Sequence, residues 1–174
     1  MAHTVLVVPV PELEAFVRER TGHYDASFLS ADPAFVHAHI TALGPFLDEP
    51  TGADLDLVGE IAGRTPAVDF TLDRLGEFAD GIIHLLPDPE TPFRELTRRL
   101  IAAFPQCPPY GGAFPEPVPH LTLDQRAAGI DPVSVRAALG DAVPARCRAD
   151  RLALYRYANH DCRVLAEWKL GEAS

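Results

Sequence analysis

Residues 36–46 read VHAHITALGPF, and residues 118–124 read VPHLTLD. Each segment contains a His-x-Thr tripeptide with an apolar middle residue, HIT at 39–41 and HLT at 120–122. In a β-strand, residues i and i+2 point to the same face, so each tripeptide presents an imidazole and a hydroxyl side by side. The two copies lie 81 residues apart in a chain of 174, which indicates a duplicated fold with two facing strands.

Along the chain, segments whose apolar residues have helical spacing are interspersed with segments whose apolar residues have strand spacing. Residues 105–119, PQCPPYGGAFPEPVP, are too rich in Pro and Gly for a regular helix or a central strand, and predict a shaped loop before the second motif. We therefore expect one α/β (α+β) domain over residues 1–174. Its predicted strands are 4–10, 35–43, 68–72, 75–78, 82–86, 118–124, 151–157 and 162–170, and its predicted helices are 12–20, 54–64, 91–104 and 131–140.

Composition and charge narrow the classes of partner. Hydrophobic residues make up 47% of the chain and charged residues 23%, which is typical of a globular protein with a real core. The formal net charge of −10 argues against a long nucleic-acid duplex as partner, because binding phosphates requires a basic face. The apolar run TVLVVPV is too short for a signal peptide or membrane span, and three cysteines without CxxC spacing indicate reduced thiols. We expect a cytoplasmic monomer.

Two imidazoles beside one phosphate form a chemically useful arrangement. Cleavage of a phosphodiester needs a base for the attacking oxygen and an acid for the leaving oxygen, and histidine can serve as either near neutral pH. Threonine hydroxyls can donate hydrogen bonds to the non-bridging phosphate oxygens. This chemistry requires no metal and no cofactor.

Histidines at such spacing also occur in zinc sites and in histidine-triad sites, but the neighbouring residues argue against both. His37 and His39 with a distant histidine would make a zinc site, yet no Cys or carboxylate lies at ligand spacing beside them. A histidine-triad site would want a third alternating histidine where Thr41 stands. His37 is interpreted as a polar residue at the cleft edge, and His84, within IIHLLP, as a strand histidine facing a core edge or the cleft.

The segments AHITALGPF, GEFADGIIHLLP and TPFRELTRRLIAAFPQCPPYGGAFPEPVPHLTL extend the pattern beyond the tripeptides. Together they resemble the two-histidine (2H) phosphoesterase superfamily in its 2′-5′ RNA ligase-like, cyclic phosphodiesterase branch. The resemblance implies a bilobal, pseudo-duplicated domain of two mainly antiparallel sheets flanked by helices, with the active-site cleft between the lobes.

The resemblance also implies residue roles and a reaction. His39 and His120 would be the catalytic pair, and Thr41 and Thr122 the phosphate-binding hydroxyls. The favoured reaction is metal-independent hydrolysis of a 2′,3′-cyclic phosphate to a product that keeps a 2′-phosphate. The alternatives are 2′-5′ RNA ligation or cleavage on the same site, and a catalytically inactive nucleotide- or RNA-binding module. We favour His120 as base and His39 as acid, although the sequence itself does not order them.

Few basic residues lie next to either motif, which favours a small nucleotide or a short RNA end with a cyclic phosphate as substrate. Tyr110, Phe114 and Phe46 lie near the motifs and could stack on a base, as aromatic side chains do in nucleotide sites. Tyr110 is preferred of the three because Gly111 and Gly112 beside it predict a close approach of the loop to a ligand. With His37, they complete the predicted substrate contacts.

Overall fold

The computed structural model describes residues 2–113 and 116–171, which form an α+β fold. Short 3₁₀ turns at Pro11–Leu13, Ala26–Phe28, Pro109–Gly112 and Gly140–Ala142 connect some of its elements. The strands are β1 (His3–Pro9), β2 (His39–Leu43), β3 (Val68–Glu77), β4 (Ile82–Asp88), β5 (Leu121–Gln125), β6 (Ala145–Ala149), β7 (Arg151–Tyr157) and β8 (Arg163–Lys169). The helices are α1 (Glu14–Tyr24), α2 (Gly52–Gly63), α3 (Thr91–Ala103) and α4 (Pro132–Leu139).

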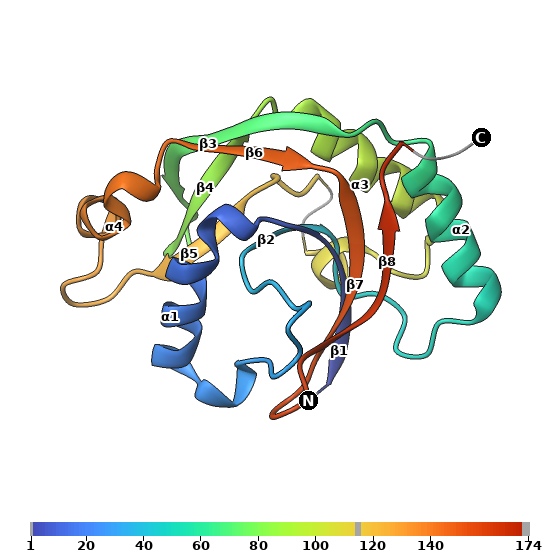
Figure 1. Ribbon diagram of the computed structural model, residues 1–174, viewed down its shortest axis with the longest axis horizontal. Coiled ribbons are helices and arrows are strands. Elements are labelled where there is room, and N and C mark those ends of the chain that lie inside the picture. The colour runs from blue at the N-terminus through green and yellow to red at the C-terminus, as the bar shows by residue number, and fades with distance from the viewer. Residues whose placement is uncertain (1, 114–115, 172–174) are drawn as a thin grey trace.

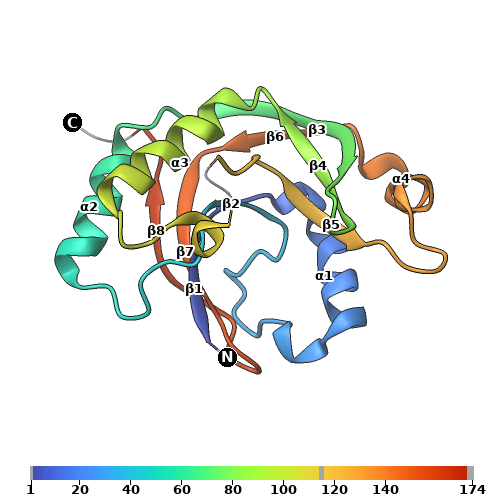
Figure 2. The same ribbon diagram turned by 180° about the vertical axis from the view of Figure 1, so that it is seen from behind.

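All eight strands of the described residues belong to one curled antiparallel sheet. Their order is β6-β3-β4-β5-β2-β1-β7-β8, so the two motif strands β5 and β2 are neighbours at its centre. Figure 1 shows the curve of this sheet, with α1 inside it, and Figure 2 shows α2 and α3 together beside β8. Each half of the sheet contributes a helix that packs on the motif strand of the other half: α1 packs on β5, and α3 packs on β2.

The expectation of two separate sheets is therefore corrected. Each half has four strands, but β2 and β5 pair through Ile40 and Leu121, and this contact makes one sheet of the two halves. The duplication shows in the strand order, since β4-α3-β5 in one half matches β1-α1-β2 in the other. The cavity that holds the motifs lies on the face of this central pair of strands.

Some predicted element boundaries also change. The predicted strands 68–72 and 75–78 are one strand, β3, whose pairing with β4 shifts register between Leu72 and Arg74. Such a bulge interrupts the alternation in sequence without ending the strand. β2 begins at His39, because the polypeptide before it turns away to contact α1. β6 was not predicted, since ARCRA is a five-residue strand whose buried face carries only Ala and Cys.

The two faces of β2 serve different purposes. Ile40 and Ala42 point into the main core, where they join Leu96 and Leu100 of α3. Thr97 of α3 donates a hydrogen bond from Oγ1 to the Ala42 carbonyl at 2.8 Å, which ties the helix to the strand. The alternate residues of β2 face the opposite side, so a buried core fixes the strand that presents the first motif.

A second apolar cluster supports the sheet on the motif side. Val5 and Val7 of β1 pack there with Phe35, which precedes β2, and with Tyr155 of β7. The rings of Phe35 and Tyr155 stack with centroids 4.3 Å apart. β1 is thus buried on both faces, as its continuous apolar sequence predicts. No helix among the described residues is long and apolar enough to cross a membrane.

Candidate active site

Both His-x-Thr motifs line one cavity. It has a volume of about 550 Å³, and His39, Thr41, His120 and Thr122 are all part of its wall. α1 forms another side of the wall through Val17, Arg20, Thr21 and Tyr24. The remaining lining residues are Asp25, Phe28, His37, Ile82, Leu123, Asp124, Gln125 and Tyr157. The structure thus brings together four side chains that the sequence pairs only as separate tripeptides.

The strand register explains how the motifs meet. Ile40 of β2 pairs with Leu121 of β5 in antiparallel orientation. One residue from this pair in one direction, His39 lies opposite Thr122. One residue away in the other direction, Thr41 lies opposite His120. The four polar side chains therefore alternate at the corners of a small quadrilateral, with each imidazole beside a hydroxyl along its own strand and another across the ladder.

Each histidine makes the same local hydrogen bond. Nδ1–H of His39 donates to the carbonyl of His37 at 2.8 Å, and Nδ1–H of His120 donates to that of Val118 at 2.7 Å. Because a carbonyl only accepts hydrogen bonds, Nδ1 carries the proton in both neutral rings. No group among residues 2–113 and 116–171 hydrogen-bonds to either Nε2. Both rings can therefore exchange protons with a ligand through Nε2.

The environment of the pair favours neutral imidazoles. Burial lowers the pKa of His39 below its usual value of 6.5, the His37 carbonyl opposes this, and the neighbouring His120 lowers the pKa further. Burial also lowers the pKa of His120, with the Val118 carbonyl acting in the opposite direction. A bound phosphate would reverse these shifts, because a nearby negative charge favours imidazolium.

Aromatic rings contact both histidines, one ring from β7 and the other from the residue that follows β3. The ring centroid of Tyr157 in β7 lies 6.2 Å from that of His39, and its hydroxyl is 3.4 Å from Nδ1. On the other side, Phe78 meets His120 edge-on with centroids 4.8 Å apart. The matching positions of Tyr157 and Phe78 in the two halves extend the duplication to the supports of the site.

His84 contacts His120 at the edge of the site, in keeping with the interpretation of His84 as a strand histidine facing a core edge or the cleft. Its buried ring stacks on Phe78 with centroids 3.9 Å apart and meets His120 edge-on at 5.3 Å. Burial lowers the pKa of His84, and the nearby His120 lowers it too. Its space depends on Gly76 in the next strand, where a Cβ atom would lie 2.7 Å from His84 Nε2. The sequence alone does not predict this contact, because the glycine and the histidine are known to lie opposite each other only once the register of β3 and β4 is known.

The described wall of the cavity carries one cationic side chain, Arg20, and two acidic ones, Asp25 and Asp124. Arg20 is the only Lys or Arg among its described lining residues, and its Nε lies 2.8 Å from Oδ2 of the buried Asp124. The Tyr24 hydroxyl also donates to Asp124. No three His, Cys, Asp or Glu side chains of the described residues group closely enough to hold a metal ion, and the metal-free mechanism remains a prediction.

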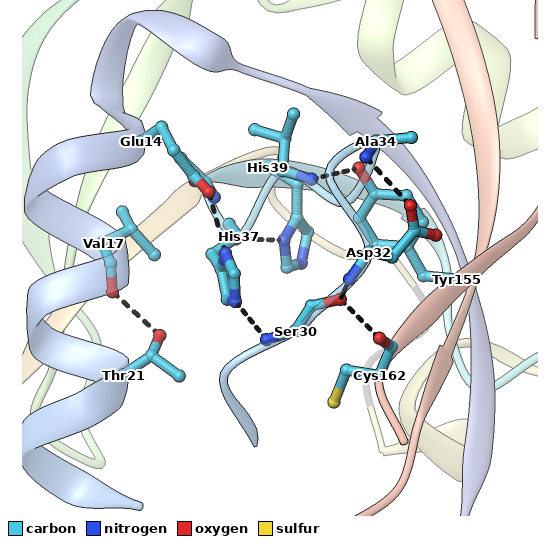
Figure 3. Close-up of polar contacts among 12 residues, drawn as sticks. Glu14, Val17, Thr21, Ser30, Asp32, Ala34, His37, His39, Tyr155 and Cys162 are labelled. Atoms are coloured by element: carbon cyan, nitrogen blue, oxygen red, sulfur yellow. Dashed lines mark hydrogen bonds and ion pairs between the residues drawn. The ribbon is translucent and has the colours of Figure 1, made fainter. Parts of the chain in front are cut away.

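His37 borders the cavity, but both of its ring nitrogens are already used. Nδ1–H donates to Glu14 Oε2 at 2.8 Å, and Nε2 accepts the backbone N–H of Ser30 at 3.1 Å. Figure 3 shows this ring lying between Glu14 and Ser30, beside His39. His37 is only 5% exposed, and its predicted contact with a substrate stays a prediction.

The three aromatic candidates have different positions. Tyr110 has a φ of 51°, and its N–H donates to the Gly44 carbonyl at 2.8 Å. Its ring lines a small neighbouring pocket with Thr41. Phe46 lies outside the main cavity, in the core, where its ring meets Phe104 edge-on at 4.9 Å. Phe114 lies outside the described residues.

The family assignment rests on a match across most of the chain. The sequence model of the 2′-5′ RNA ligase superfamily matches residues 9–161, a range that contains both motifs. The chain therefore belongs to the 2′-5′ RNA ligase superfamily, the two-histidine phosphoesterases, and the family predicted from sequence is confirmed. No curated protein is similar enough to count as a relative.

Solved structures share the fold at low sequence identity. A protein described as a phosphoesterase is 21% identical with a TM-score of 0.57, and the match covers 97% of each chain. E. coli LigT complexed with NADP⁺ is 22% identical with a TM-score of 0.56, covering 97% of this chain and 96% of LigT. The protein TT0787 of Thermus thermophilus is 19% identical with a TM-score of 0.59, covering 97% of this chain and 98% of its own. These similarities establish the fold alone.

Proposed function

We propose that this protein is a metal-independent phosphoesterase that hydrolyses 2′,3′-cyclic phosphates of nucleotides or short RNA ends. The observation that carries the proposal is the placement of both His-x-Thr pairs, on neighbouring strands, in the wall of one cavity. Two imidazoles with bare Nε2 atoms and two hydroxyls supply a base, an acid and two hydrogen-bond donors around one phosphate. Membership of the 2′-5′ RNA ligase superfamily supports the same chemistry.

The proposed step breaks one P–O bond with water. Nε2 of neutral His120 takes a proton from water as its oxygen attacks phosphorus, and Nε2–H of protonated His39 gives a proton to the departing 3′ oxygen. The products are a free 3′ hydroxyl and a 2′-phosphate, and the two imidazoles have exchanged protonation states. The hydroxyls of Thr41 and Thr122 donate to the non-bridging oxygens, whose negative charge increases during attack.

The size and charge of the cavity favour a substrate with a single phosphate. About 550 Å³ suits a mononucleotide or the last residue of an RNA strand. The one cationic side chain in the described wall is paired with Asp124, so a long polyanion finds no basic track there. The related E. coli LigT has been crystallised with 3′-AMP and with NADP⁺, which supports a nucleotide as ligand.

The family match also favours a second candidate, 2′-5′ RNA ligation or cleavage on the same residues. It uses the same acid and base, with a ribose hydroxyl in place of water. A module that binds a nucleotide without turning it over is the alternative from another class.

The test is an incubation of the purified protein with the four nucleoside 2′,3′-cyclic monophosphates and a short RNA with a cyclic phosphate end. EDTA is present throughout, and chromatography separates 2′- from 3′-phosphates. We expect 2′-phosphates from the unmodified protein and losses of about 10²-fold or more in His39→Asn and His120→Asn. His160→Asn is the matched control, because His160 is exposed and its φ of 60° suits asparagine. Equal turnover in all four proteins would contradict the proposal.

A further inference from the structure

The peptide between His37 and Ala38 connects a carboxylate to His39. Its N–H donates to Glu14 Oε1 at 2.9 Å, and its carbonyl accepts Nδ1–H of His39 at 2.8 Å. The other carboxylate oxygen of Glu14 accepts Nδ1–H of the His37 ring at 2.8 Å. Glu14 therefore contacts both the backbone and the side chain of the residue that orients His39. Figure 3 shows Glu14 reaching this turn from α1.

We propose that Glu14 is a positioning residue for His39 and acts through the His37–Ala38 peptide. This proposal rests on the proposed function for its consequence in catalysis, but not for the hydrogen bonds themselves. A carboxylate on the N–H of a peptide holds the plane of that peptide, and it strengthens the carbonyl on the other side as an acceptor. The carbonyl then fixes the ring and the tautomer of His39, leaving Nε2 directed to the cavity.

The protonation state of Glu14 agrees with this role. Burial alone would raise its pKa, but hydrogen bonds from His37 and Ala38 hold the pKa below the usual 4.5, so Glu14 is ionised at neutral pH. Its negative charge raises the pKa of His39, against the effect of burial. The ionisable groups that face His39 are Glu14 from α1, His37 from the preceding segment, His120 from the neighbouring strand, and Tyr155 and Tyr157 from β7.

The second motif has no equivalent of this arrangement. His120 donates to the Val118 carbonyl, but the next residue is Pro119, which has no N–H. No carboxylate can therefore bind that peptide in the way Glu14 binds the first. The difference separates two otherwise matching histidines, because only His39 has an anion behind its supporting peptide. Glu14 raises the pKa of His39 and so favours the imidazolium form that the acid in the proposed reaction requires, whereas the anion that raises the pKa of His120 is Asp80, from the turn between β3 and β4.

The inference is tested by measuring the pKa of His39 and His120 by ¹⁵N NMR in the unmodified protein, in Glu14→Gln and in Glu60→Gln. Glu60 is exposed on α2, so its variant removes the same charge from a remote surface. We expect Glu14→Gln to lower the pKa of His39 and leave that of His120 unchanged, and Glu60→Gln to change neither. An unchanged pKa of His39 in Glu14→Gln, or equal shifts of both histidines, would overturn the proposal.

Two further measurements keep the test decisive. In the unmodified protein, acid titration of Glu14 must shift the Ala38 amide proton and the His39 ring together, whether or not Glu14→Gln folds; independent titrations would refute the link. In turnover assays, Glu14→Gln should lower kcat about tenfold and displace the acid limb of the pH profile. This loss is a part of the roughly 10²–10⁴-fold rate enhancement that acid–base catalysis provides. Glu14→Asp should recover part of the lost kcat. A protein that is silent on every substrate would refute the proposed function, while the NMR titration would still decide the role of Glu14.

Discussion

Ile40 and Leu121 hold equivalent positions in the two His-x-Thr motifs, and they pair with each other where the halves of the sheet meet. An approximate twofold axis therefore passes between them, in the middle of the candidate site. Because both residues are buried, their neighbours along the strands are directed to the opposite face, into the cavity. A single strand pair thus places two copies of a weak local motif around one ligand position.

The hydroxyls of the motifs should contribute to the transition state more than to the fold. Thr41→Val and Thr122→Val keep the side-chain shape but remove a donor, and each should lower kcat about 10²-fold, as loss of one preorganised donor does. Thr71→Val is the control, since Thr71 lies on β3 outside the cavity. Steady-state kinetics with a cyclic mononucleotide measure the effect. A variant that raises KM alone would show that its hydroxyl binds the ground state equally well.

The stability of the protein should fall between pH 8 and pH 5.5. In the folded state the pKa values of His39, His84 and His120 are lowered from 6.5, chiefly by burial. The unfolded chain then binds more protons than the folded one as the pH drops through about 6.5, and stability is lost. Urea denaturation at several pH values tests this. His84→Asn should show a smaller loss over the same interval, and a slope identical to that of the unmodified protein would exclude His84 as a contributor.

Gly76 should be intolerant of even a methyl group. A Cβ there would lie 2.7 Å from His84 Nε2, and His84 cannot move freely because it stacks on Phe78. Gly76→Ala should therefore cost about 1–3 kcal/mol of unfolding free energy, as overpacking does. Gly52→Ala is the matched control, because a Cβ at Gly52 meets nothing within 4 Å. Equal stability of the two variants in urea denaturation would mean that the β3–β4 contact is looser than described.

Lengthening the RNA should not strengthen binding. Arg20 is already paired with Asp124, so phosphates beyond the cyclic one have no free cation in the described wall of the cavity. We expect KM for a cyclic mononucleotide and for a short RNA with the same end to agree within about tenfold, with a salt dependence of about one released counterion or less. A much lower KM for the RNA, with a steep salt dependence, would reveal a basic track elsewhere on the protein.

The motif chemistry was readable in the sequence because it is local. Because side chains on a strand alternate with a period of two, His39 and Thr41 are predicted to share a face, and the second tripeptide at 120–122 predicts another such pair. Joining two predicted sheets into one depends on a single pair of residues, Ile40 and Leu121, which leaves no periodic signal. The family, the α+β class and most elements followed from sequence, whereas the sheet count and the short strand β6 did not.

The supports of the site were beyond sequence reasoning for another reason. Glu14 and Asp124 have partners that are distant in sequence, His37 and Arg20 respectively. An acidic residue on a helix is normally solvated, and only the tertiary packing of α1 brings Glu14 to His37 and Arg20 to Asp124 of β5. His37 borders the cavity, as its alternation with His39 predicted, but the chain leaves strand geometry before β2 and largely buries the residue.

The central claim is that His120 and His39 act as base and acid on one phosphodiester. The most direct measurement compares hydrolysis of a cyclic nucleotide with its analogue in which sulfur replaces the 3′ oxygen, because a thiolate leaves without needing a proton. We predict that His39→Asn loses activity on the oxygen substrate but approaches the unmodified protein on the sulfur substrate, whereas His120→Asn loses activity on both. Equal losses of both variants on both substrates would contradict the assignment of acid and base.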